Sequence, residues 1–90
     1  MKIIQSNRFK RKLKKLHPKE KDTMDQVVFK IQKNPFLGPL KLGHLKNTRV
    51  HKFRMQNQLT LLAYIFFESE KVISLVDFGP HENFYRDLER

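Results

Sequence analysis

Two cations in the middle of the chain have a spacing that suits joint chemistry. Lys52 and Arg54 are two residues apart in a stretch that reads as a β-strand. Side chains at this spacing point to the same side of a strand, so both cations reach one surface. Fixed cations stabilise the extra negative charge of a pentavalent phosphorus transition state. They would equally serve a protein that binds nucleic acid without cleaving it, or a plain solvated sheet surface, so all three interpretations stay open.

The segment 79–86 carries the side chains best suited to proton transfer. His81 is of the type that exchanges a proton near neutral pH. Tyr85 follows four residues later, so in a helical turn it would share a face with His81, beside Arg86. A tyrosine there can stack on a base or donate a proton. A lone histidine is more often a structural residue, and we expect Phe84 to pack on the sheet.

The charge of the chain favours a polyanionic partner. The 90 residues carry a formal net charge of +10, which favours nucleic acid, an acidic protein or an anionic membrane surface. The densest cationic block, residues 8–15, contains no acidic residue, and we expect its Lys12 to bind phosphate. Other candidates for phosphate binding lie near the Lys52–Arg54 pair: Lys46, Arg49 and His51. Arg86, near the C-terminus, is a further candidate.

The composition excludes several classes of chemistry. The chain has no cysteine, which rules out disulfides and thiolate chemistry. Its four histidines lack the spacing of metal ligands, so we expect neither a metal nor another cofactor. RNA cleavage stays available without a metal, because RNA supplies its own nucleophile in the 2′-OH. No stretch is apolar and long enough to span a membrane and none resembles a secretion signal, so we expect a cytoplasmic protein.

The hydrophobic pattern predicts one α+β domain over residues 1–90. Ser6 or Asn7 is expected to cap a first helix, and Pro18 suits the first position of a second helix. We expect these two helices to form an antiparallel hairpin on a small, mainly antiparallel sheet. The predicted order is β-α-α-β-β-β: a strand at 2–5, helices up to 17 and over 18–33, a loop at 34–48, strands at 49–55, 59–67 and 72–78, and an optional short C-terminal helix.

The turn at 56–58 decides which residues of the central hairpin share a face. We expect a three-residue turn, because it pairs apolar residues with apolar residues. In that register the helix-covered side of the sheet carries three pairs: Met55 with Leu59, Phe53 with Leu61, and His51 with Ala63.

The order of elements and several short motifs resemble the RelE/ParE superfamily of type II toxin–antitoxin toxins, most of all its RelE/YafQ-like mRNA interferases. The resemblance covers nearly the whole chain. It rests on the stretch 38–41 before the sheet, the Arg-rich strand leading into 61–64, and the closing segment 77–86, which is similar to the terminal Gly-x-His-x-x-x-aromatic pattern of the family.

The resemblance implies a ribosome-dependent mRNA endoribonuclease that inhibits translation and is neutralised by a cognate antitoxin. It implies that His81 and Tyr85 take part in proton transfer or substrate orientation, and that Arg54 and Lys52 stabilise the transition state. Arg49 matches an arginine with a role in phosphate binding or structure. Two alternatives stay open: a ParE-like inhibitor of DNA gyrase without nuclease activity, and a nucleic-acid-binding module without catalysis.

Overall fold

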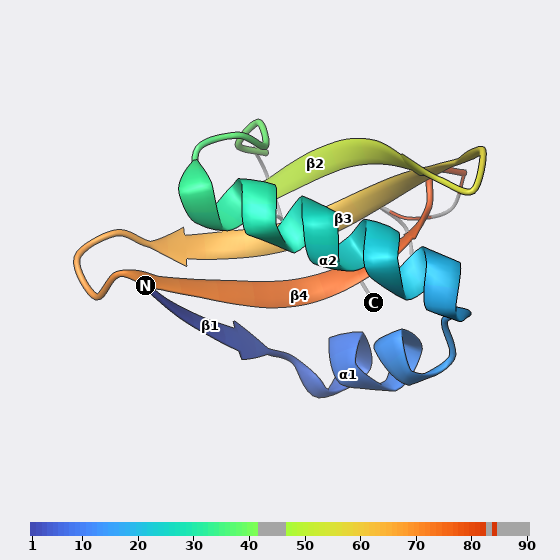
Figure 1. Cartoon of the computed structure of the whole chain (residues 1–90). Coiled ribbons are helices and arrows are strands. Elements are labelled where there is room, and N and C mark those ends of the chain that lie inside the picture. The colour runs from blue at the N-terminus through green and yellow to red at the C-terminus, as the bar shows by residue number, and fades with distance from the viewer. Residues whose placement is uncertain (42–46, 83, 85–90) are drawn as a thin grey trace.

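Two helices cover one face of a four-stranded sheet in the computed structural model, which describes residues 1–41, 47–82 and 84 (Figure 1). This arrangement confirms the predicted α+β class and the predicted order of elements. In chain order the elements are β1 (Lys2–Gln5), α1 (Asn7–Lys14), α2 (Pro18–Lys33), β2 (Thr48–Met55), β3 (Gln58–Phe67) and β4 (Val72–Pro80). The predicted C-terminal helix falls largely outside the described residues.

The strands lie in the order β1-β4-β3-β2. β1 is parallel to β4, whereas β2, β3 and β4 are joined as consecutive antiparallel hairpins. A parallel pair needs a long crossover connection, and here that connection includes both helices. The sheet is therefore mixed, and its two edges are β1 and β2.

Local signals in the sequence set the starts of both helices. The Ser6 hydroxyl accepts a hydrogen bond from the Phe9 amide at 3.0 Å and caps α1, as expected for a short polar side chain at this position. Pro18 begins α2, and the Glu20 carboxylate accepts from the His17 amide at 2.9 Å. As predicted, the helices run in opposite directions across the sheet (Figure 1). α1 lies against β4 and α2 against β2.

Apolar residues are buried on both faces of the sheet. Beneath the helices, Phe9 and Ile31 pack with Leu62 and Tyr64 of β3 in the larger core. On the opposite face a smaller cluster forms around the ring of Phe84, which is 3% exposed and packs with Val50, Leu61 and Ala63. The packing of Phe84 on the sheet confirms the prediction from the sequence.

The predicted three-residue turn is wrong. Gln56 and Asn57 alone connect β2 to β3, and their φ angles are 49° and 70°. Two consecutive positive φ angles match the twist of a two-residue hairpin. The observed partners are Met55 with Gln58, Phe53 with Thr60 and His51 with Leu62.

The corrected register moves part of β3 to the other face. Phe53 still packs with the helix-side core, but Leu61 and Ala63 belong to the cluster around Phe84. Pairing apolar with apolar residues could not select the register, because Phe84 provides an apolar cover for the second face as well. We call this second side of the sheet, opposite α1 and α2, the helix-free face.

Candidate functional site

Lys52 and Arg54 both lie exposed on the helix-free face of β2. Lys52 pairs with Leu61 of β3, and Arg54 pairs with Leu59. The Arg54 guanidinium also donates a hydrogen bond to the carbonyl of Asn57 at 3.3 Å, which tethers it to the hairpin turn. The two cations are thus neighbours on one surface, as strand alternation requires.

His81 comes to the same end of the sheet. Its backbone amide donates to the Leu59 carbonyl at 3.1 Å, which continues the β3–β4 pairing one step beyond the Thr60–Pro80 pair. Since Leu59 pairs with Arg54 on its other side, the backbones of His81 and Arg54 are two strand spacings apart, about 10 Å. The His81 side chain is exposed. The backbone of His81 therefore lies within reach of long side chains on β2.

Gly79 lies against the Phe84 ring on the helix-free face. Gly79 pairs with Leu61, in the same row of the sheet as Lys52. A Cβ atom on Gly79 would lie 3.5 Å from the Phe84 ring and 3.6 Å from the Lys12 ammonium. Both distances are ordinary van der Waals contacts, so the Phe84 ring and the Lys12 ammonium both lie against the backbone of Gly79. Three of the predicted site residues lie outside the described residues: Lys46, Tyr85 and Arg86.

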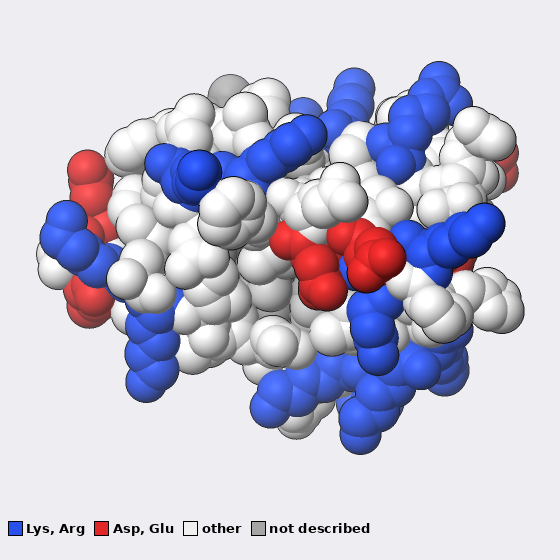
Figure 2. All heavy atoms as spheres, viewed as in Figure 1, with Lys and Arg blue, Asp and Glu red and all other residues white. Residues whose placement is uncertain are grey.

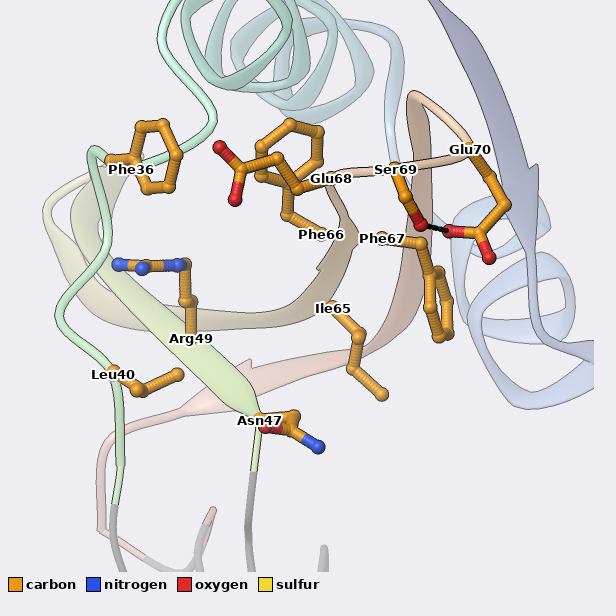
Figure 3. Close-up of a pocket in the computed structure, with 10 residues that line it drawn as sticks. All are labelled: Phe36, Leu40, Asn47, Arg49, Ile65, Phe66, Phe67, Glu68, Ser69 and Glu70. Carbon is orange, nitrogen blue, oxygen red and sulfur yellow. Dashed lines mark hydrogen bonds between the residues drawn. The ribbon is translucent and has the colours of Figure 1, made fainter.

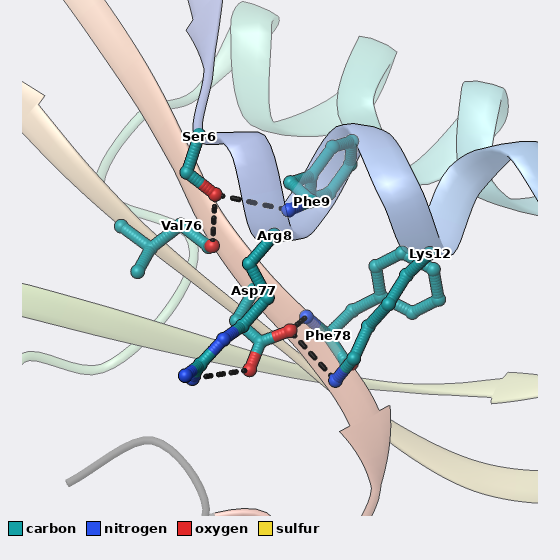
Figure 4. A network of polar contacts seen from close by, with 7 residues as sticks. All are labelled: Ser6, Arg8, Phe9, Lys12, Val76, Asp77 and Phe78. Carbon is teal, nitrogen blue, oxygen red and sulfur yellow. Dashed lines mark hydrogen bonds and ion pairs between the residues drawn. The ribbon is translucent and has the colours of Figure 1, made fainter. Parts of the chain in front are cut away.

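The Lys12 ammonium is held at β4 by a fully buried carboxylate (Figure 4). It lies 2.8 Å from Asp77 Oδ1 and donates to the Phe78 carbonyl, also at 2.8 Å. Asp77 Oδ1 accepts from the Phe78 amide as well, and Asp77 Oδ2 lies 3.5 Å from the Arg8 guanidinium. A phosphate would have to compete with these oxygens for Lys12.

Sequence reasoning missed Asp77. A carboxylate within an apolar strand, combined with cations four residues apart on a helix at Arg8 and Lys12, is the only signal that the sequence offers. That signal becomes specific only once α1 is known to pack beside β4.

Arg49 lies at the other end of β2 and holds a loop. Its guanidinium donates to the Gly38 carbonyl at 2.9 Å and lies 5.0 Å from the centre of the Phe36 ring. The Tyr64 hydroxyl accepts from the Gly38 amide and donates to the Pro35 carbonyl, each at 2.8 Å. Burial raises the pKa of Tyr64, although the Gly38 hydrogen bond and the charge of Arg49 oppose this shift. Of the two roles expected for Arg49, the observed contacts are those of the structural one.

His51 lies on the helix side of β2, half-buried, and does not share a face with Lys52 and Arg54. Its ring stacks on that of Phe53, with the ring centres 6.1 Å apart and the planes 11° from parallel. Burial lowers the pKa of His51, and the positive charge of Lys30 lowers it further.

In the described ranges, no three histidine or acidic side chains gather into a group that could hold a metal ion. The same ranges contain no helix with the length and apolarity to cross a membrane. The side chains described at this end of the sheet are two cations, Lys52 and Arg54, and the imidazole of His81.

A comparison with protein families matches residues 3–89 to the model of the ParE-like toxin of type II bacterial toxin–antitoxin systems. No curated protein matches the chain.

Solved structures share the fold at low sequence identity. The E. coli RelE toxin, as an arginine-to-alanine double mutant in the free state, superposes with a TM-score of 0.76 at 16% identity, covering 98% of this chain and 90% of that one. The toxin fold in the intact E. coli RelBE toxin–antitoxin complex gives a TM-score of 0.72 at 15% sequence identity, and the match covers 90% of this chain and 96% of that one. A conserved hypothetical protein from Helicobacter pylori gives a TM-score of 0.58 at 21% sequence identity, and the match covers 93% of this chain and 98% of that one.

Proposed function

The chain belongs to the ParE-like toxins of type II bacterial toxin–antitoxin systems, and on this premise we propose that it is a metal-independent endoribonuclease that cleaves mRNA on the ribosome. The observation that supports this proposal is that the backbone of His81 lies at the same end of the sheet as Lys52 and Arg54, two strands away from them. A gyrase inhibitor without chemistry of its own has no need of this combination.

The proposed reaction uses the 2′-OH of RNA as the nucleophile. The 2′ oxygen loses its proton, forms a bond to the adjacent phosphorus, and the bond from phosphorus to the 5′ oxygen breaks as that oxygen takes up a proton. The products are a 2′,3′-cyclic phosphate and a 5′-OH. His81 exchanges one of these protons, and Lys52 and Arg54 stabilise the negative charge on the phosphorane oxygens. Tyr85 orients the substrate or transfers the other proton.

The remaining cations would bind the RNA outside the reacting phosphate. Lys46 and Arg86 stay candidates for this role. Lys12 and His51 are weaker candidates, because Lys12 is bound to Asp77 and His51 lies on the helix side.

We also propose a cognate antitoxin as the partner of this chain, and the cytoplasm as its location. Matching RelE structures include the complex with the antitoxin RelB and a complex with a RelB peptide. The net charge of +10 suits a partner with acidic segments, because opposite charges accelerate association and favour the correct partner.

Inducible expression in a bacterial host tests the proposed site. His81→Ala and Arg54→Ala should each relieve growth arrest. Loss of a general acid–base group, as in the first variant, slows cleavage by about 100-fold or more, and loss of a group that stabilises transition-state charge, as in the second, slows it by about 100-fold or more. Lys19→Ala removes an exposed cation of α2 and serves as the matched control, which should stay toxic. Circular dichroism should show all variants folded. Full toxicity of both site variants would refute the assignment.

A ParE-like action on DNA gyrase is the second candidate, favoured by the name of the matching family. It predicts that the purified toxin inhibits supercoiling by gyrase, that expression induces a DNA-damage response, and that mRNA stays intact.

A further inference from the structure

A groove at the end of the sheet remote from the candidate site has the properties of a docking surface (Figure 3). It has a volume of about 590 Å³ and runs between the loop after α2 and the β3–β4 turn. Phe36 and Leu40 line it from the loop side, and Ile65 and Phe67 line it from β3. Asn47, at the groove, and Arg54, at the site, are seven positions apart on one extended segment, about 20 Å at the rise of a β-strand.

The groove leaves large apolar side chains in water. Phe36 is 52% exposed, Leu40 49% and Phe67 43%. Phe36 and Phe66 meet edge to face at 5.3 Å and form one continuous aromatic wall. Single exposed apolar residues are normal, but several that surround one hollow mark an interaction site.

The loop that presents these side chains is held in place on both sides. Gly38 is fixed by Tyr64 and Arg49, as described above. Beyond it, the Val50 amide donates to the Pro39 carbonyl at 3.1 Å and the Lys41 amide donates to the Thr48 carbonyl at 2.8 Å. A groove whose wall is already ordered loses little conformational entropy when a partner binds.

The rim of the groove carries charge of the sign opposite to that of the whole molecule. Glu68 and Glu70 follow directly after β3, and acidic side chains appear at this end of the molecule in Figure 2. The Glu68 carboxylate points into the hollow, toward Phe36 (Figure 3). Among the described residues neither carboxylate takes part in an ion pair, whereas the nearby Arg49 already donates to Gly38.

These features select one kind of occupant. A second copy of the chain would bring another +10 charge, which opposes association over most of the surface. RNA would meet two carboxylates at the rim and apolar walls. A polypeptide with an aliphatic or aromatic side chain next to a lysine or arginine fits both the apolar walls and the acidic rim of the groove. Its apolar side chain fills the hollow, and its cation contacts Glu68 and the aromatic wall.

We propose that this groove docks a polypeptide segment that combines an apolar anchor with a neighbouring basic residue. This inference is independent of the nuclease assignment, because the groove and the candidate site lie at opposite ends of β2 and β3. A partner could therefore occupy the groove while RNA occupies the site.

Titration of the full-length, isotope-labelled protein with two blocked peptides tests the proposal by NMR. The peptides are Ser-Lys-Leu-Phe-Lys-Ser and its counterpart with glutamate in place of both lysines. The basic peptide should shift the backbone amides of residues 36–38, 40 and 65–70, and the acidic peptide should bind about fivefold more weakly. Equal affinities, or shifts confined to other residues, would overturn the proposal.

Three variants and one competitor sharpen the test. Glu68→Lys should abolish or reverse the preference for the basic peptide, whereas Asp25→Lys, the matched change at an exposed acid of α2, should preserve it. Phe67→Ser should weaken the binding of both peptides. The fold should stay intact, because the Phe67 ring is partly exposed. A preference that survives Glu68→Lys would contradict the proposal, as would a single-stranded oligoribonucleotide that shifts the same amides.

Discussion

At the scale of single residues, Asp77 joins α1 to β4. It is fully buried, and both of its carboxylate oxygens face cations of α1. A buried charge is tolerated only when it is paired and hydrogen-bonded. Asp77 therefore orders the last residues of β4, which lead to His81.

Replacing Asp77 with alanine should destabilise the fold by about 2–4 kcal/mol. This loss of stability is smaller than the loss expected on breaking a fully buried ion pair. The side chains of Arg8 and Lys12 are each 41% exposed, so both cations can turn to water. Lys12→Met should cost less, since Arg8 still faces the carboxylate. Denaturation by urea measures both variants. A smaller loss for Asp77→Ala than for Lys12→Met would contradict this account.

His51 should make the stability of the protein depend on pH. Its pKa is lowered in the folded state from the ordinary value of 6.5, so just below that pH the unfolded chain binds more protons than the folded one. The free energy of unfolding should therefore rise with pH through this window and fall as the pH drops below it. His51→Gln should flatten the dependence in thermal melts between about pH 5 and pH 7. If stability depends on pH equally steeply in His51→Gln, His51 does not contribute to the pH dependence.

Individual residues differ in how far the sequence could predict them. Alternation alone placed Lys52 and Arg54 on one surface, because the period of a strand does not depend on the rest of the fold. The role of Asp77 could not be predicted, because it depends on contacts between residues that lie more than sixty positions apart. The same holds for Arg49, whose partner Gly38 is reached only after the loop folds back on β2.

At the scale of elements, the sequence predicts where the helices start but not how long the hairpin turn is. Capping by Ser6 and the position of Pro18 are local features, and both define the observed helices. The turn was misread because both faces of the sheet are apolar, so the hydrophobic pattern does not fix the register.

The observed turn predicts a stabilising double substitution. Gln56 and Asn57 both have positive φ, a conformation that Asn followed by Gly adopts most readily. Gln56→Asn combined with Asn57→Gly should raise stability by about 1 kcal/mol, measured as a higher melting temperature, because glycine adopts a positive φ without strain.

Insertion of one glycine between these two residues is the matched test of the register. It would create the three-residue turn and oppose the pairing of β2 with β3, so it should destabilise the protein. An insertion that leaves the melting temperature unchanged would mean that the hairpin does not depend on the two-residue turn.

At the scale of the whole molecule, the proposed site and the proposed docking groove lie at opposite ends of the sheet. The helices bury the larger core on one face, which leaves Lys52 and Arg54 exposed on the other with the backbone of His81 at the same end. The apolar groove with its acidic rim lies at the opposite end of the sheet. We therefore expect substitutions to alter the proposed chemistry and the proposed docking independently.

Primer extension on abundant mRNAs after induction of the protein tests the central claim most directly. The account predicts cuts within translated codons for the wild type and for Lys19→Ala, and none for His81→Ala expressed at the same level. Growth arrest with uncut mRNA would contradict the nuclease assignment and favour gyrase as the target. Equal cutting by His81→Ala would exclude His81 from the mechanism.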